Sequence, residues 1–398
     1  MKPRILYFPC FVYSTSFLLI FFIYKMGWSD LYPELEGPLV WFLLTTIFLS
    51  FLLSIFQSYT LKEKHEVIKL SEGFIKRSIL FILFGYTLEF LYERSIPLVS
   101  TIISSSFSYK DFTGIPTFHV ILSTYNIFFS ILIFEYYLCE KSKRNFLCFC
   151  ISMVPFILVM NRGAFMIVLS AILFVFLMKI KVINIKTVMK ICGILLGVFF
   201  LFGVIGNVRQ EQTKEDKEYL LRIGGASEKF IESGIPNEYY WSYIYIISPL
   251  GNLQNIVNEK KSDFDIHNIP VFAATELLPD FISKRVSSSL LSEKELDNIG
   301  IEDYLVTPVL NAPTIYYSSF FFLGYTGLII MFLVLMISGL IYPMILPSDS
   351  SYYVTAIASL NAIILLCTFN NMFFATGTIL FWPLILNFID RIKLKSDV

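Results

Sequence analysis

The sequence predicts an all-α polytopic membrane protein with about ten transmembrane helices and one large loop between the seventh and the eighth. Apolar residues make up 56% of the chain and charged residues 16%, and the mean hydropathy is +0.68. Soluble domains average about 45–50% apolar and about 25% charged residues. The apolar residues also gather in long runs, and most of the remaining polar residues form a single segment. This pattern excludes a water-soluble globular enzyme.

Ten apolar runs approach the length of about 20 residues that a helix needs to cross the hydrocarbon core. They lie at 5–24, 37–56, 78–97, 114–137, 146–160, 163–178, 187–206, 317–342, 352–369 and 373–389. The first run has no small-residue cleavage site, so it is predicted to be a retained anchor rather than a signal peptide. The chain therefore divides into spans 1–7 within residues 1–206, a cap loop at 207–316, and spans 8–10 with a tail within 317–398.

Basic residues set the predicted orientation. Seventeen lysines and arginines flank the first run or lie in the alternate connections 62–77, 141–144 and 179–190 and the tail, against four in the short connections on the other side. Both termini are therefore expected in the cytoplasm and the cap loop on the outer face. The basic run 62–77 is interpreted as a topology determinant.

The predicted cap loop is acidic, with 17 acidic and 10 basic residues. Aromatic and apolar stretches at about 239–257 and 270–282 favour a folded cap with short helices, and the segment from Tyr239 to Leu250 could instead lie in the membrane interface. None of the six cysteines lies in this loop, so no disulfide framework is expected. The whole chain balances 31 basic against 31 acidic residues, so nucleic acid is not expected as a partner.

Arg162 lies between two short apolar runs, in Asn161-Arg162-Gly163. The 18 helical steps from Arg144 to Arg162 span about 27 Å, less than the hydrocarbon thickness of about 30 Å. An arginine at that depth is costly unless it is paired or solvated. It is interpreted either as an interfacial residue whose side chain reaches the headgroups or as an anion ligand facing a cavity.

Arg209, at the end of the seventh run, and Arg222, early in the cap loop, are expected on the same outer side. Each alone is consistent with a solvated surface charge. Together with Arg162 they would supply the planar, bidentate donors that suit a diphosphate.

Glu89 and His119 are the candidate catalytic groups. Glu89 lies about 18 Å along a helix from Arg77, within the outer half of the membrane, and shares a helix face with Glu93. It is either a structural partner of an arginine, with Arg162 the obvious candidate, or a catalytic carboxylate. His119 is expected at the outer boundary, as a hydrogen-bonded structural group or as a general base, because imidazole titrates near neutral pH. An acidic residue of the cap is the remaining candidate for the base.

No metal or cofactor is expected. Asp263-Phe264-Asp265 matches an Asp-x-Asp metal site formally, but such a match arises readily by chance in an acidic loop, and no His or Cys cluster lies beside it. The chain also lacks a phosphate-binding glycine loop, a nucleophile elbow and a His-Glu-x-x-His motif.

From about residue 78 to about 340, the chain resembles the O-antigen and oligosaccharide repeat-unit polymerases (Wzy-type) of bacterial surface-polysaccharide assembly. The resemblance depends on the order of short motifs within this topology. These are LEFLYE at 88–93 followed by Pro97-Leu98, YKDFTGIP at 109–116 followed by His119, NRG at 161–163, and a long outer loop. That loop begins with Arg209, contains Ser248-Pro249-Leu250 and Asn252, and leads into GYTG at 324–327.

The resemblance implies a metal-independent inverting glycosyltransferase at the periplasmic face of the bacterial inner membrane. Such an enzyme moves a growing glycan from undecaprenyl diphosphate onto the non-reducing end of a lipid-linked repeat unit. The implied partners are this lipid-linked oligosaccharide, as donor and acceptor, membrane lipid and a chain-length regulator protein. Arginines would stabilise the diphosphate leaving group, and a general base would take the acceptor's proton.

Three alternatives stay open at the sequence level. An O-antigen ligase would use the same donor with a lipid A-core acceptor. A lipid-linked oligosaccharide flippase needs a polar path through the membrane, whereas the intramembrane charges here gather at the outer end. A polysaccharide acyltransferase is disfavoured because no span carries a cytoplasmic histidine motif.

Overall fold

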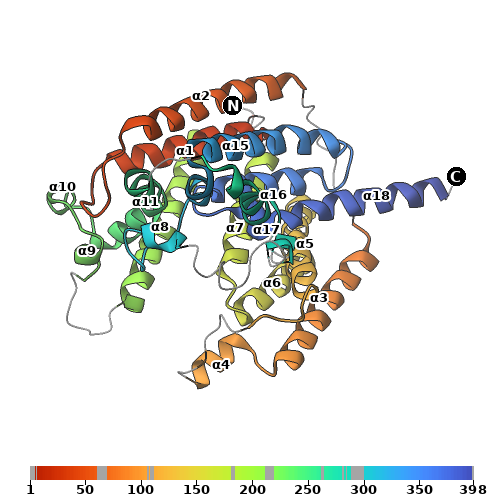
Figure 1. The fold of residues 1–398 in the computed structure, drawn as a ribbon. Coiled ribbons are helices and arrows are strands. Elements are labelled where there is room, and N and C mark those ends of the chain that lie inside the picture. The colour runs from red at the N-terminus through yellow and green to blue at the C-terminus, as the bar shows by residue number, and fades with distance from the viewer. Residues whose placement is uncertain are drawn as a thin grey trace.

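The computed structural model describes the chain except for residues 1–4, 6, 61–69, 105–106, 108–111, 181–183, 211–218, 261–263, 280–281, 284, 288–299 and 397–398, and except for some side chains. The described residues form helices (Figure 1), with one isolated bridge between Ser29 and Ala226. The α-helices are α1 (Pro9–Lys25), α2 (Gly37–Thr60), α3 (Glu72–Glu93), α4 (Pro97–Ile103), α5 (Phe118–Glu140), α6 (Lys143–Leu158), α7 (Arg162–Lys179), α8 (Ile185–Gln210), α9 (Tyr219–Ile223), α10 (Glu228–Ile231), α11 (Asn237–Glu259), α12 (Ile269–Phe272), α15 (Ile315–Ile345), α16 (Tyr353–Leu366), α17 (Met372–Thr376) and α18 (Phe381–Ser396). The shorter turns are η3 (Ile266–Asn268), η4 (Ala273–Leu277), η5 (Ile301–Tyr304) and η6 (Gly377–Leu380).

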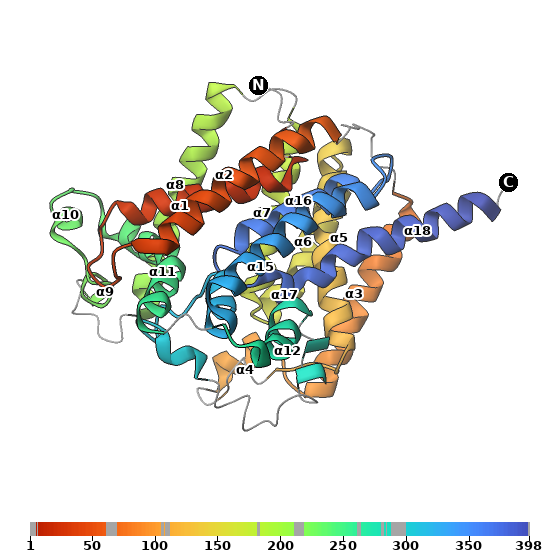
Figure 2. The ribbon, with the colours of Figure 1, turned by 45° about the horizontal axis from the view of Figure 1, so that its top comes forward.

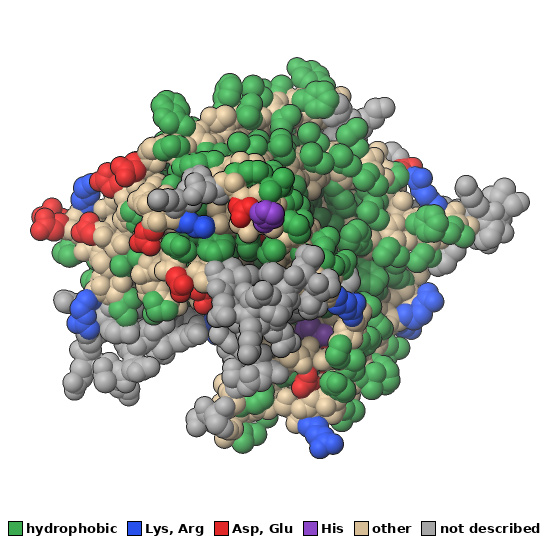
Figure 3. Space-filling model, in the orientation of Figure 1, with side chains coloured by type: hydrophobic (Ala, Val, Ile, Leu, Met, Phe, Trp, Pro, Cys, Tyr) green, Lys and Arg blue, Asp and Glu red, His purple; other side chains and the backbone are tan. Residues whose placement is uncertain are grey.

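Each of the ten predicted apolar runs lies largely on helix, which confirms the all-α class. Among the described residues, five helical stretches are long and apolar enough to cross a membrane: Gly37–Tyr59, Phe118–Glu140, Arg162–Lys179, Ile315–Ile345 and Met372–Ile392. Apolar side chains also cover much of the face shown in Figure 3, and many large apolar side chains are exposed, as expected of a chain that faces lipid. The structure therefore supports a membrane-embedded protein, while the count of ten spans remains a prediction.

The helix boundaries differ from the predicted runs where local chemistry ends a helix. The run predicted at 78–97 is helical from Glu72 to Glu93. Ser71 caps its start by accepting a hydrogen bond from the Phe74 amide, and Arg94 ends it in the left-handed conformation with φ 53°. Both are standard devices for terminating a helix, and apolarity alone does not report them.

The predicted cap contains one long helix as well as short ones. The helix α11 has 23 residues and packs against α8 and α1, whereas short helices alone were predicted for this loop. It covers the aromatic stretch predicted at 239–257, and its buried residues include Tyr240, Trp241 and Tyr243. In Figure 2, α9, α10 and α11 lie on one side of the helix bundle, while α18 projects from the other.

Cap residues contact the connections that were predicted to lie on the outer face. The hydrogen bonds between the cap and these connections or the adjacent span ends include Asp30 N to Gly225 O at 2.7 Å, Arg285 Nη2 to Thr117 Oγ1 at 2.6 Å, and Asn371 Nδ2 to Glu276 O at 2.8 Å. We call this side of the bundle the cap end.

The connections predicted to be cytoplasmic contact one another instead. The side-chain contacts among these connections and the adjacent span ends include Arg144 to Glu72 at 2.8 Å, Lys179 to Glu135 at 2.8 Å, and Tyr352 to Asp390 at 2.8 Å. We call this side the tail end. The two ends therefore divide the connections as the basic-residue pattern does, although the orientation in a membrane remains a prediction.

The run predicted as a single span at 317–342 contains a sharp turn. Gly324, inside α15, has φ 56° and ψ −143°, which is not helical. The hydroxyl of Tyr13 contacts that of Tyr316, and its ring lies 5.6 Å from Phe332, so residues on either side of Gly324 reach the same part of α1. Glycine adopts such backbone angles without a steric penalty. The first part of α15 therefore folds back against the second.

Candidate functional site

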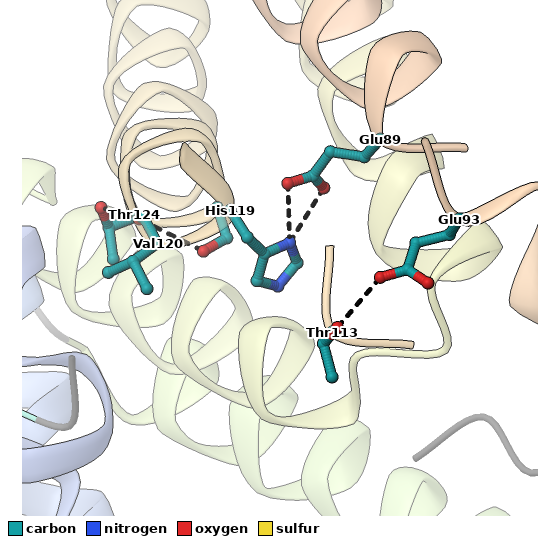
Figure 4. A network of polar contacts seen from close by, with 7 residues as sticks. Glu89, Glu93, Thr113, His119, Val120 and Thr124 are labelled. Atoms are coloured by element: carbon teal, nitrogen blue, oxygen red, sulfur yellow. Dashed lines mark hydrogen bonds and ion pairs between the residues drawn. The ribbon is translucent and has the colours of Figure 1, made fainter. Parts of the chain in front are cut away.

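The two candidate catalytic residues contact each other at the cap end (Figure 4). Nδ1 of His119 lies 2.9 Å from Oε2 and 3.1 Å from Oε1 of Glu89. Glu89 is in the last turn but one of α3, and His119 is in the first turn of α5. The Glu89 side chain is fully buried, whereas that of His119 is 24% exposed. The site is therefore a buried carboxylate whose imidazole partner reaches the surface.

A close approach of α3 and α5 makes this pairing geometrically feasible. Gly85 lies one helical turn before Glu89, and a Cβ at Gly85 would lie 2.6 Å from Cδ1 of Leu122, which follows His119 on α5. A side chain at Gly85 would require the buried Leu122 side chain to shift, so the glycine favours the close packing of the two helices. Gly85 therefore helps to set the distance between the carboxylate and the imidazole.

The connection between α3 and α5 folds over the pair. Gly114 has φ +67°, and a Cβ there would lie 2.7 Å from Nδ1 of His119 and 2.9 Å from Oε1 of Glu89. Thr113, next to it, donates a hydrogen bond of 3.0 Å to Glu93 (Figure 4). The Phe112 ring lies 6.0 Å from the imidazole in an edge-on arrangement. The backbone at Gly114 therefore covers the Nδ1 side of the ring, and the Phe112 ring lies beside the imidazole.

This arrangement suits an imidazole base. An ionised carboxylate only accepts hydrogen bonds, so Glu89 favours the tautomer with the proton on Nδ1. The lone pair is then on Nε2, on the opposite side of the ring. A buried carboxylate that orients a histidine in this way is the base-and-orienter part of a hydrolase triad. The third member would be a hydroxyl supplied by a substrate.

Arg285 is a charged neighbour of the site that the sequence analysis did not select. Its Nη2 donates to Oγ1 of Thr117 at 2.6 Å, and Thr117 is the N-cap residue of α5, two positions before His119. No spacing in the sequence links residue 285 to residue 119. The feature that could have selected Arg285 is its residue type. It is one of five arginines expected on the outer side, with Arg94, Arg162, Arg209 and Arg222.

Arg162 is the first residue of α7, and its side chain is exposed. Asn161 caps the helix by accepting a hydrogen bond of 2.9 Å from the Ala164 amide, and Met160 has φ 59°. The Asn161-Arg162-Gly163 segment therefore has a local structural task, which is to begin α7 directly after α6. Thr101 of α4 contacts Sδ of Met160 at 3.7 Å, so α4 lies beside this turn.

The other two predicted arginines lie on different elements. Arg222 belongs to α9, which lies at the edge of the molecule and apart from α7 in Figures 1 and 2. Arg209 belongs to the last turn of α8, and its side chain is outside the described residues. A single cavity shared by Arg162, Arg209 and Arg222 stays a prediction.

A buried acid of the cap is a second candidate base. Glu276 is in η4, and Asn371 Nδ2 donates to its backbone oxygen at 2.8 Å and to its Oε2 at 3.1 Å. Burial raises the pKa of Glu276 to about 7, although hydrogen bonds from Asn371 and Ser318 oppose the shift. A carboxyl group with such a pKa, buried near a predicted site, is a functional candidate.

Within the described residues, no group of three or more His, Cys, Asp and Glu side chains is placed to hold a metal ion. Asp263 of the Asp-x-Asp match lies outside the described residues.

Comparison of the chain with protein-family models, with curated proteins and with solved structures found no match.

Proposed function

We propose that this protein is a surface-polysaccharide polymerase of the bacterial inner membrane, with its active site at the cap end facing the periplasm. The observation that carries the proposal is the His119–Glu89 pair, a solvent-reaching imidazole oriented by a buried carboxylate. Arg285 next to it, and Arg162 on α7, supply positive charge for a phosphate-bearing donor. The resemblance to the Wzy-type polymerases described above names the same reaction.

In the proposed reaction, Nε2 of His119 takes the proton from a hydroxyl at the non-reducing end of a lipid-linked repeat unit. The oxygen attacks the anomeric carbon of the growing glycan, and the bond from this carbon to undecaprenyl diphosphate breaks with inversion. The diphosphate leaves with the bonding electrons, and arginines stabilise its charge. A base of this kind contributes about 100- to 10,000-fold to a rate.

The glycan pattern of a deletion strain tests the reaction. Loss of a polymerase leaves single repeat units attached to the lipid A core, and the gene in trans should restore a ladder. Bare core would contradict the proposal, because loss of an O-antigen ligase or of a lipid-linked oligosaccharide flippase has that result. A ladder unchanged by the deletion would also contradict it.

The orientation has its own test. Reporter fusions at Lys260, directly after α11, and at Lys395, in the tail, should give periplasmic and cytoplasmic signals respectively. A cytoplasmic signal at Lys260 would reverse the topology, and the site would then face the wrong compartment for a lipid-linked glycan.

A further inference from the structure

A polar cavity lies between the connection 26–36 and the cap, separate from the His119–Glu89 pair. Its volume is about 370 Å³, within the range of roughly 300–1,000 Å³ of small-molecule sites. Three tyrosines, Tyr24, Tyr32 and Tyr243, contribute to its lining and are buried. Four exposed charged residues also line it, namely Lys25, Asp30, Glu34 and Lys229. The cavity therefore combines an aromatic floor with a charged rim.

Hydrogen bonds hold its two walls together. Asp30 N donates to Gly225 O at 2.7 Å, and Ser227 N donates to Trp28 O at 3.0 Å, on either side of the Ser29–Ala226 bridge. The Trp28 ring packs against Tyr243 of α11, with ring centroids 5.1 Å apart. The connection and the cap are thus fixed to each other, which favours a preformed site over a surface depression.

Two of the tyrosine hydroxyls can each form a further hydrogen bond with a ligand. Tyr24 Oη donates to Pro33 O at 2.6 Å, so its lone pairs can accept a further hydrogen bond. Tyr243 Oη accepts from Trp28 N at 3.0 Å, so its own hydrogen can be donated. The floor therefore offers both an acceptor and a donor beside aromatic rings.

The charged residues at the rim disfavour ligands that carry a net charge of either sign. Asp30 and Glu34 repel an anion, while Lys25 and Lys229 repel a cation, so neither sign is favoured. A neutral molecule with many hydroxyl groups uses both, because each hydroxyl donates to a carboxylate and accepts from an ammonium group. The apolar face of a sugar ring also suits a tyrosine ring, which is an apolar surface with a polar edge.

We propose that this cavity binds a neutral sugar residue of the glycan substrate, away from the reacting bond. The proposal rests on the polymerase function proposed above and adds a place at which the substrate is recognised. The ligand is distinguished from a phosphate or a quaternary ammonium group by the balanced rim.

Direct binding by the full-length protein in lipid nanodiscs tests the proposal without requiring catalysis. The probe is the repeat-unit oligosaccharide released by mild acid from the lipid-linked intermediates of the deletion strain, and Kd is measured by saturation-transfer NMR titration. Maltoside detergents are omitted because their head group is itself a neutral sugar. Asp30→Ala combined with Glu34→Ala should raise Kd about tenfold or more, because charge-assisted hydrogen bonds to the sugar are lost.

Matched controls come from the same elements. Glu36 and Glu228 are exposed acids near the cavity that do not line it, so the double variant Glu36→Ala/Glu228→Ala should bind as the wild type does. Tyr243→Phe should weaken binding by removing the donor hydroxyl. Tyr240→Phe removes a hydroxyl of the same helix that donates to Gly224 O at 2.6 Å outside the cavity lining, and it should not.

Equal binding of the oligosaccharide by the wild type and the Asp30/Glu34 variant would overturn the proposal, as would no binding by the wild type. Competition by inorganic phosphate or by choline at the oligosaccharide's own Kd would overturn the assignment to a neutral sugar. The polymerase function fails separately, through the glycan pattern of the deletion strain. Binding that depends on Asp30 and Glu34, in a protein whose deletion leaves bare core, would keep the cavity and reject polymerisation.

Discussion

Two glutamates, one at each end of the helix bundle, are each buried beside a basic side chain. They differ in how the two carboxylate oxygens and the basic partner are hydrogen-bonded. At the tail end, Glu135 contacts Lys179 through Oε1 at 2.8 Å and Thr355 through Oε2 at 2.7 Å, so each oxygen has its own donor. At the cap end, both oxygens of Glu89 face the single atom Nδ1 of His119. Within the described residues, the second ring nitrogen of His119 has no hydrogen-bond partner.

The comparison separates a structural ion pair from a candidate catalytic one. The Glu135 contacts join three helices, α5, α7 and α16, and complete the hydrogen bonds of the carboxylate. The Glu89 contact joins two helices and orients a titratable ring that reaches the surface. Burial and a basic partner are common to both sites, so neither property identifies a function. The nitrogen lone pair available for proton transfer is the difference.

The largest expected effect is the loss of polymerisation when the cap-end pair is replaced, and not when the tail-end glutamate is replaced. His119→Ala should lower the polymerisation rate about 100- to 10,000-fold, because the base is removed. Glu89→Gln should lower it by a similar factor, because an amide can donate to Nδ1 and stabilise the wrong tautomer. The rate is measured as ladder formation in membranes, normalised to the amount of folded protein.

Glu135→Gln is the matched control, since it is the same substitution at a buried helical glutamate. It should leave the rate per folded molecule unchanged. Wild-type polymer from His119→Ala would remove His119 as the base, and Glu276 of the cap would then be the next acid to replace.

A large effect on stability is expected at the tail end. Lys179→Met leaves the buried Glu135 carboxylate without its cation, and breaking a buried pair in this way costs about 3–5 kcal/mol. The double variant Glu135→Gln/Lys179→Met should recover much of that loss, because no charge is left unpaired. The free energy of unfolding of both variants is measured in lipid nanodiscs. If Lys179→Met is as stable as the wild type, the burial of the Glu135 carboxylate does not depend on its ion pair with Lys179.

A third buried glutamate, Glu276, extends the comparison because its closest partner is the neutral amide of Asn371. Burial raises its pKa from 4.5 to about 7. Between these values the folded chain holds a proton that the unfolded chain has released, so the free energy of unfolding should fall as the pH rises. The fall is at most about 3 kcal/mol for a shift of this size.

Thermal unfolding at pH 5 and at pH 7.5 measures this dependence, and Glu276→Gln should remove it because the amide does not titrate. Asp303→Asn, at an exposed acid of the same cap, is the control and should leave the dependence intact. A wild type with no loss of stability between the two pH values would place the Glu276 pKa near its ordinary value.

The sequence predicts the helices well and the contacts between them poorly. The ten apolar runs all lie largely on helices, because apolarity over about 20 residues is a local signal. The fold-back at Gly324 was missed because a span and a helical hairpin have the same composition. Arg285 was missed because its contact with Thr117 crosses 168 positions of the chain.

For the site, sequence analysis selected Glu89 and His119 and assigned both to the outer part of the membrane. It considered Arg162 as the partner of Glu89 and did not pair the two selected residues. Their contact depends on the close approach at Gly85 and on the connection that passes over them at Gly114. The close approach and the path of the connection both depend on how the helices pack in three dimensions. The sequence around Gly85 and Gly114 does not report that packing.

The smallest expected effect concerns arginine geometry at the two ends. Arg162→Lys should lower polymerisation about tenfold or more, nearly as much as Arg162→Ala, if two parallel hydrogen bonds to a diphosphate are needed. Arg285→Lys should be milder, because lysine can still donate one hydrogen bond to Thr117. Arg144, which pairs with Glu72 at the exposed tail end, is the control, and its replacement by lysine should not change the rate, since exposed ion pairs contribute little. A fully active Arg162→Lys protein would refute the bidentate geometry and leave a point-charge role for residue 162. A loss of polymerisation in Arg144→Lys would show that arginine is needed at both ends for folding rather than for the diphosphate.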